Sequence, residues 1–216
     1  MLNKKHMLEM KEPPMTIISA MKESESSILL ASDSEVSING IRLNYGNKLC
    51  RHPDANLAWA ISGDHTIGAD RFTSWLKAYK PPFPDWETFS DKAIEKFSEL
   101  NGQRRKLMEL SGVKPTAENE LCDCLLVGYL DRPNILVLND NGIATLNWRF
   151  DFESIGVGRL HAWVAYKALM RFEIPPLPKM RSIMEAVVTS ASNCNQPVYI
   201  WRVSQNGIFE GLERDK

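Results

Sequence analysis

Apolar residues in this chain switch between two spacings, and the order of the switches restricts the fold more than any other feature. The runs with β-type spacing lie at 16–21, 28–32, 57–61, 125–129, 135–138, 143–146, 198–201 and 207–209. The stretches with helical spacing lie at 67–79, 85–110, 161–172 and 179–192. The order along the chain is therefore strands, two helices, strands, two helices, strands.

Direct hairpin connections favour antiparallel sheets over a parallel βαβ arrangement. Asn139-Asp140-Asn141-Gly142, between two of the apolar runs, is a strong hairpin signal. Two antiparallel sheets stacked face to face, each covered outside by a helix pair, would bury all the apolar faces. We therefore predict an α+β fold, a four-layer αββα sandwich.

Composition excludes several classes of protein. The 26 Lys and Arg residues balance 27 Asp and Glu residues, which argues against nucleic acid or an anionic membrane as the main partner. The apolar runs are much shorter than the roughly 20 residues that cross a bilayer. Residues 1–15 lack the apolar core of a secretory signal, and the thiols suggest a reducing compartment, so we expect a cytoplasmic protein.

The usual cofactor, metal and nucleophile motifs are missing. Cys122 and Cys124 would share one face of a strand, but no second pair or nearby His completes a zinc site. We therefore interpret the cysteines as structural thiols and expect no metal or cofactor. His52 and His65 lie outside any ligand or triad spacing and are expected to be structural.

A nucleophilic mechanism without a histidine base can use an N-terminal Thr, whose own α-amino group accepts the hydroxyl proton. That amine titrates near pH 8, close enough to neutrality to act as a base. Such a site also needs a buried Lys, an Asp that fixes the Lys, and an N–H for the oxyanion. Thr16, Asp33 and Lys48 offer the first three groups.

Five short motifs occur in the order found in one peptidase family. They are Met15-Thr16-Ile17-Ile18-Ser19-Ala20, Ala31-Ser32-Asp33-Ser34, Lys48-Leu49-Cys50-Arg51, Ala58-Trp59-Ala60-Ile61-Ser62-Gly63-Asp64 and Ile155-Gly156-Val157-Gly158. Together they resemble proteasome β-type subunits and the bacterial HslV peptidase, which are N-terminal-nucleophile (Ntn) hydrolases. The resemblance covers roughly residues 15 to 205. It divides the chain into 1–15, an N-terminal extension or propeptide, and 16–216, a proteasome-like domain.

The resemblance implies roles for individual residues. Thr16 would be the nucleophile, with its freed amine as base, and Asp33 would orient Lys48. The backbone N–H of Ala60 would donate to the oxyanion, and Ser37, Ala60 and Ser62 would line a groove that binds the substrate backbone as an added strand. The resemblance further implies a peptide or unfolded-protein substrate, a homo-oligomeric ring and an ATPase unfoldase as a candidate partner. Trp75, Trp86 and Trp163 are candidate interface aromatics.

The sequence leaves three interpretations open: an active threonine peptidase, a catalytically inactive ring or shell subunit, and another Ntn amidase. Val157 stands where the family commonly has a Ser, and Ala60 where it usually has a Gly. The segment 191–194 lacks the family's Asp. A gapless match puts Met15 under the family's catalytic Thr, whereas the spacing to Lys48 favours Thr16. Residues 1–14 are either a propeptide or an over-called start.

Overall fold

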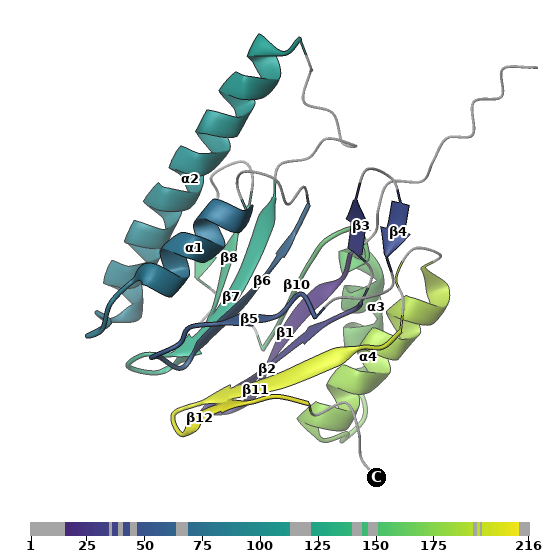
Figure 1. Cartoon of the computed structure of the whole chain (residues 1–216). Coiled ribbons are helices and arrows are strands. Elements are labelled where there is room, and N and C mark those ends of the chain that lie inside the picture. The colour runs from purple at the N-terminus through teal and green to yellow at the C-terminus, as the bar shows by residue number, and fades with distance from the viewer. Residues whose placement is uncertain are drawn as a thin grey trace, which may run out of the picture.

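The computed structural model describes residues 16–34, 36–38, 41–43, 47–63, 69–112, 122–139, 144–146, 151–191, 194 and 196–211. Four helices and twelve strands lie in this part of the chain (Figure 1). The helices are α1 (Asp70–Ala78), α2 (Trp86–Leu110), α3 (Arg159–Leu169) and α4 (Pro176–Ser190). The strands are β1 (Ile18–Ser24), β2 (Ser27–Ser32), β3 (Val36–Ile38), β4 (Ile41–Leu43), β5 (Cys50–Arg51), β6 (Leu57–Ser62), β7 (Asp123–Tyr129), β8 (Pro133–Leu138), β9 (Ala144–Leu146), β10 (Phe152–Ile155), β11 (Tyr199–Ser204) and β12 (Gly207–Phe209).

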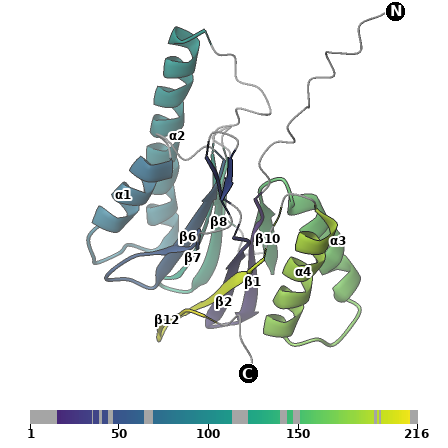
Figure 2. The ribbon, with the colours of Figure 1, turned by 45° about the vertical axis from the view of Figure 1, so that its right-hand side comes forward.

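Two five-stranded antiparallel sheets form the middle of the molecule. The first has the order β10-β1-β2-β11-β12, and the second has the order β5-β6-β7-β8-β9. Helices α1 and α2 cover the outer face of the second sheet, and α3 and α4 cover the outer face of the first (Figure 2). The predicted α+β fold, a four-layer αββα sandwich, is confirmed.

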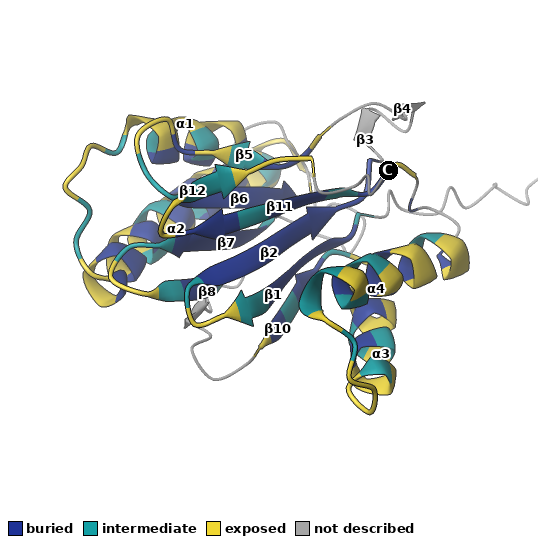
Figure 3. Cartoon of the chain, turned by 90° about the horizontal axis from the view of Figure 1, so that it is seen from below, coloured by how far each residue is buried: buried dark blue, intermediate teal, exposed yellow. Residues whose placement is uncertain are grey.

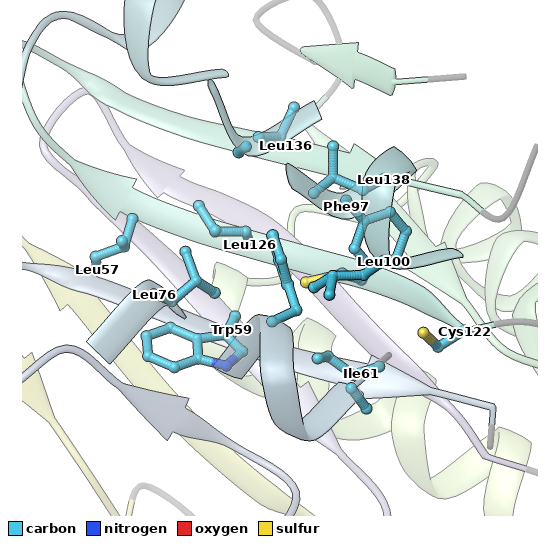
Figure 4. Close-up of a cluster of buried hydrophobic side chains, with 14 of the residues drawn as sticks. Leu57, Trp59, Ile61, Leu76, Phe97, Leu100, Cys122, Leu126, Leu136 and Leu138 are labelled. Carbon is cyan, nitrogen blue, oxygen red and sulfur yellow. The ribbon is translucent and has the colours of Figure 1, made fainter. Parts of the chain in front are cut away.

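Alternation along the strands gives each sheet two buried faces. On β1, Ile18 and Ala20 pack between the sheets, whereas Met21, like Ile17 just before the strand, packs against α3 and α4. All six residues of β2 are buried, as the dark blue strand in Figure 3 shows. Figure 4 shows the third cluster, in which side chains of β6, β7 and β8 meet those of α1 and α2. Strands buried on both faces read as continuous apolar runs, which is why the sequence shows them clearly.

The structure differs from the sequence-based prediction at several elements, including α4 and β10, and at Trp86. Helix α4 begins at Pro176 and not at Lys179, because proline is tolerated in the first turn, where its missing N–H has no partner to lose. The edge strand β10 was not predicted, since its four residues include only Phe152 and Ile155 as large apolar side chains. The prediction that Trp86 lies at an interface is wrong, because Trp86 is fully buried within the chain and donates through Nε1 to the Arg132 carbonyl.

The described cysteines are all free thiols. Cys122 and Cys124 are buried in the same cluster beneath α2, as their spacing predicted, and burial holds the pKa of Cys124 well above its usual value. None of the helices in the described ranges is both long enough and apolar enough to cross a bilayer.

Candidate active site

The candidate site lies at one end of the strands of the first sheet, where β1 begins and its two neighbours, β10 and β2, end. Thr16 lies two residues before β1, Asp33 directly follows β2, and Gly156 directly follows β10. Because β1 pairs antiparallel with both β2 and β10, these three positions meet at the same end of the three strands. Lys48 reaches this end from the segment just before β5, in the other sheet.

Lys48 joins the two predicted partners directly. Its Nζ donates to Asp33 Oδ1 at 2.6 Å and to Thr16 Oγ1 at 3.1 Å. The side chains of Lys48 and Asp33 are only 2% and 0% exposed, so this ion pair is almost completely shielded from water. Asp33 Oδ1 also accepts the backbone N–H of Ile17 at 3.1 Å, which ties the carboxylate to the residue after Thr16. The structure therefore brings Thr16, Asp33 and Lys48 together.

The turn after β10 holds the backbone of Thr16. Gly156 has φ +87°, and a Cβ at this position would lie 2.1 Å from the Thr16 carbonyl oxygen. The N–H of Gly158 points at the same oxygen from 3.5 Å. Only glycine satisfies both the positive φ and the close approach. The Thr16 main chain is thus fixed on one side by Asp33 and on the other by this turn.

The backbone of β6 alternates in direction, and this decides which of its N–H groups can reach the site. The Leu57 carbonyl accepts the His52 N–H on the β5 side, whereas the Asn56 carbonyl accepts the Tyr129 N–H on the β7 side. If this alternation continues along β6, the N–H groups of its even-numbered residues point at β7. The N–H of Ala60 is then directed at its partner Leu125. Ala60 therefore lies inside the ladder, an unfavourable position for an oxyanion donor, and its predicted role stays untested.

Gly63 belongs to one of the five motifs, but the sequence assigned the oxyanion donor to Ala60 and gave Gly63 no role. It directly follows β6, is exposed and has φ +104°. The Cys50–Trp59 register, continued by two residues, puts Lys48 level with Ile61, so Gly63 lies just beyond Lys48 along the same edge. Odd-numbered residues of β6 point toward the β5 side, which is the side of Lys48. A glycine at the end of a continuous apolar strand is the sequence signal for such a position.

The other two predicted groove residues, Ser62 and Ser37, lie in different settings. Ser62 is 5% exposed at the end of β6 and pairs with Asp123 of β7. Ser37 pairs with Arg42 in the β3–β4 hairpin, but its side chain lies outside the described part of the structure. Val157, between the two glycines of the turn, is 44% exposed. Met15, and with it the alternative register, also lies outside the described residues.

These contacts define what the site can do chemically. Since the Lys48 ammonium donates to Thr16 Oγ1, the hydroxyl proton remains free to go to another base. The buried positive charge also stabilises negative charge developing on Oγ1. Among the described residues, no group of three or more His, Cys, Asp or Glu side chains gathers as a metal site would require.

Comparisons with known proteins show the fold but not the family. No protein-family model matches the chain, and no curated protein matches its sequence. Among solved structures, the crystal structure of eukaryotic HslV from Trypanosoma brucei matches with a TM-score of 0.63 and 16% sequence identity. The match covers 88% of this chain and 100% of that one. The chain therefore has a proteasome- and HslV-like fold.

Proposed function

We propose that this protein is a threonine-type peptidase in which Thr16, once it is the N-terminal residue, is the nucleophile. The observation that carries the proposal is the Lys48 ammonium, buried against Asp33 and 3.1 Å from Thr16 Oγ1. A lysine in that position lowers the cost of forming an alkoxide-like oxygen. The proposal is also supported by the fold, because the chain is similar in structure to eukaryotic HslV.

The chemistry then needs only groups of this chain. The free Thr16 amine takes the Oγ1 proton as the oxygen attacks the peptide carbonyl, and the resulting ammonium protonates the leaving amine. Water, deprotonated by the same amine, hydrolyses the ester and restores the hydroxyl. We assign the oxyanion donor to the N–H of Gly63 rather than that of Ala60, because Gly63 lies outside the ladder on the Lys48 side.

The proposed substrate is an extended peptide or unfolded protein. Gly63 is exposed and lies beyond the last residue pair of β6, Ser62–Asp123, so a peptide could add as a strand beside Gly63, next to Ser62. Ser37 stays a proposed second contact. A cytoplasmic homo-oligomeric ring that works with an ATPase unfoldase completes the proposal, and it is inferred from the resemblance and the fold.

The decisive experiment asks whether Thr16 is a free N-terminus. Intact mass of the purified protein should show the loss of residues 1–15. A peptidyl epoxyketone should then attach to both the hydroxyl and the amine of Thr16, and activity should rise between about pH 6.5 and 8.5 as that amine loses its proton. Thr16→Ala should abolish labelling and activity while the oligomer stays intact. Peptide cleavage by a protein that keeps Met15 would contradict this mechanism.

Lys48→Ala tests the electrostatic role separately. Loss of one such preorganised group is expected to lower kcat by about 10²-fold or more. Lys96→Ala is the matched control, because Lys96 also pairs with a carboxylate, Glu99 at 2.7 Å, but is partly exposed on α2. Hydrolysis of a fluorogenic peptide by Lys48→Ala at the rate of the control would exclude Lys48 from the mechanism.

One observation favours the alternative of an inactive ring subunit. The turn that holds Thr16 presents the apolar side chain of Val157 and not a hydroxyl that could bind the Thr16 amine. A protein that keeps Met15, cleaves nothing and still forms a ring would support this alternative. The third candidate, another Ntn amidase, would show Thr16 labelling together with hydrolysis of small amides but not of peptides.

A further inference from the structure

We propose that His52 is a positioning residue for Lys48, acting through the hydrogen bond between its Nε2 and the Tyr79 carbonyl. This inference concerns the geometry of the site and rests on the proposed function only for its effect on catalysis. His52 begins the turn between β5 and β6, four residues after Lys48. Its ring therefore joins the segment that carries Lys48 to the end of α1.

Lys48 needs such an anchor because the strand that follows it is short. β5 consists of two residues, is the edge strand of its sheet, and pairs with β6 only at Cys50–Trp59 and Arg51–Ala58. Beyond the ladder, Arg51 bonds to Glu210 at 3.2 Å, but both side chains are about half exposed, at 58% and 45%. An exposed ion pair of this kind fixes a strand only weakly.

His52 is the buried anchor of the same segment. It is 2% exposed, and its ring packs edge-on against Phe83 with the centroids 5.0 Å apart. Nε2 lies 2.8 Å from the Tyr79 carbonyl, and Nδ1 accepts the Asp54 N–H at 3.0 Å. Since a carbonyl only accepts and a backbone N–H only donates, the ring is the neutral tautomer with its proton on Nε2. Each ring nitrogen thus makes one defined bond.

The far end of this connection is rigid. Tyr79 caps the C-terminus of α1, whose Phe72 and Leu76 are fully buried in the core beneath the helix pair. The Tyr79 hydroxyl accepts from Lys92 of α2 at 3.3 Å, which ties the same residue to the neighbouring helix. His52 therefore fixes a two-residue edge strand to the layer formed by α1 and α2.

A shift of this segment would act first on the contact with Thr16. Lys48 Nζ is 2.6 Å from the Asp33 carboxylate but 3.1 Å from Thr16 Oγ1, so the charged bond is the shorter and stronger of the two. When the backbone moves, the ammonium stays with Asp33 and leaves the hydroxyl. A misplacement of about 1 Å at a reacting group can cost about 10²-fold in rate.

Two substitutions separate the two bonds of the ring. His52→Gln keeps an amide donor near the position of Nε2, and His52→Asn keeps only an acceptor near the position of Nδ1. With kcat normalised to titrated sites, we expect His52→Gln to stay near wild type. His52→Asn should lose about 10- to 100-fold in kcat with KM unchanged, because the effect is on chemistry. Lys106→Asn, at an exposed position on α2, is the control.

A crystal structure of His52→Asn gives a second measurement that does not depend on activity. The distance from Lys48 Nζ to Thr16 Oγ1 should exceed about 3.5 Å in this variant and stay within it in His52→Gln. Wild-type kcat, or an unchanged distance, in His52→Asn would overturn the inference, as would equal losses in both variants. If the wild-type protein is inactive, the proposed function fails and the distance alone decides. If His52→Asn does not fold, His52→Phe replaces it.

Discussion

Asp33 shows how one buried residue can align two parts of a site. Its Oδ1 accepts the Lys48 ammonium and the Ile17 N–H, so the cation and the main chain next to Thr16 share one acceptor atom. A buried ion pair is weak evidence for stability, but removing one partner leaves an uncompensated charge and typically costs about 3–5 kcal/mol. The geometry of this pair therefore matters more to the site than its net contribution to folding.

Glu153 is a second residue whose surroundings act on its charge. It lies on β10, and burial raises the pKa of its carboxyl despite a backbone hydrogen bond from Ser154. A carboxyl with a raised pKa in the folded state favours folding at low pH. That stability is lost as the pH rises from the unfolded pKa through the folded one.

Glu153→Gln should therefore have a higher Tm than wild type at pH 7, because the substitution removes a partly buried negative charge. The difference should shrink below about pH 4, where glutamic acid is protonated in both states. Thermal denaturation at the two pH values measures it, with the exposed Glu173→Gln as control. A difference of the same size at both pH values would contradict this explanation.

At the scale of elements, the turn from β10 to α3 is as specific as the side chains of the candidate site. It supplies no charged group, yet it fixes the Thr16 carbonyl through Gly156 and Gly158. The contact depends on the absence of a side chain at Gly156. It can therefore be recognised only in the folded structure, where the turn and Thr16 lie side by side.

Gly156→Ala should lower kcat by about 10²-fold, because the new Cβ must displace the Thr16 main chain. Gly112→Ala is a matched control. Gly112 also has a positive φ, +69°, but an added Cβ there meets nothing within 4 Å. Both variants place an alanine at a positive φ, so what distinguishes them is the contact of the new Cβ with Thr16. Equal activity in the two variants would show that the turn does not position the nucleophile.

The sequence predicted long elements better than local backbone geometry. The runs that became β2, β6 and α2 were found because burial on both faces, or a long helical period, leaves a strong pattern. Residue types with defined chemistry, Thr16, Asp33 and Lys48, could be paired from spacing and resemblance. The direction of the Ala60 N–H, the role of Gly63 and the anchor at His52 depend on register and on contacts between distant segments. No local pattern encodes the direction of the Ala60 N–H or the anchor at His52, and Gly63 is marked only as a glycine at the end of an apolar strand.

At the scale of the whole molecule, the two helix layers differ in what they expose. On α3 and in the turns that flank it, Val157, Leu160, Val164, Met170 and Phe172 are 44%, 69%, 63%, 54% and 59% exposed. Figure 3 shows the exposed outer faces of α3 and α4 in yellow. Contiguous exposed apolar residues mark surfaces that other molecules cover. This layer is therefore where the proposed ring would make contacts.

Light scattering at micromolar concentration should give an oligomer for the wild-type protein. Replacing Leu160 and Val164 with Asp should reduce its mass, because charges would then lie in the contact, with little change in Tm. The control replaces Leu107 and Leu110 with Asp, since these are also exposed, at 47% and 85%, but lie at the end of α2. A monomeric wild type would contradict the ring, and equal masses for both double variants would exclude α3 from the contact.

The place of β10 in the first sheet has a consequence for the order of events during synthesis. Thr16 is among the first described residues to be translated, but its carbonyl is held by a turn at residues 156–158. β1 also waits for β10, because Ile18 pairs with Ile155 and accepts a bond from the Ser154 hydroxyl, 136 positions away. A ribosome must therefore complete nearly three quarters of the chain before β10 and the turn that follows it can pack against β1 and Thr16. The fold itself delays the assembly of the site around the proposed nucleophile until most of the polypeptide that will enclose it exists.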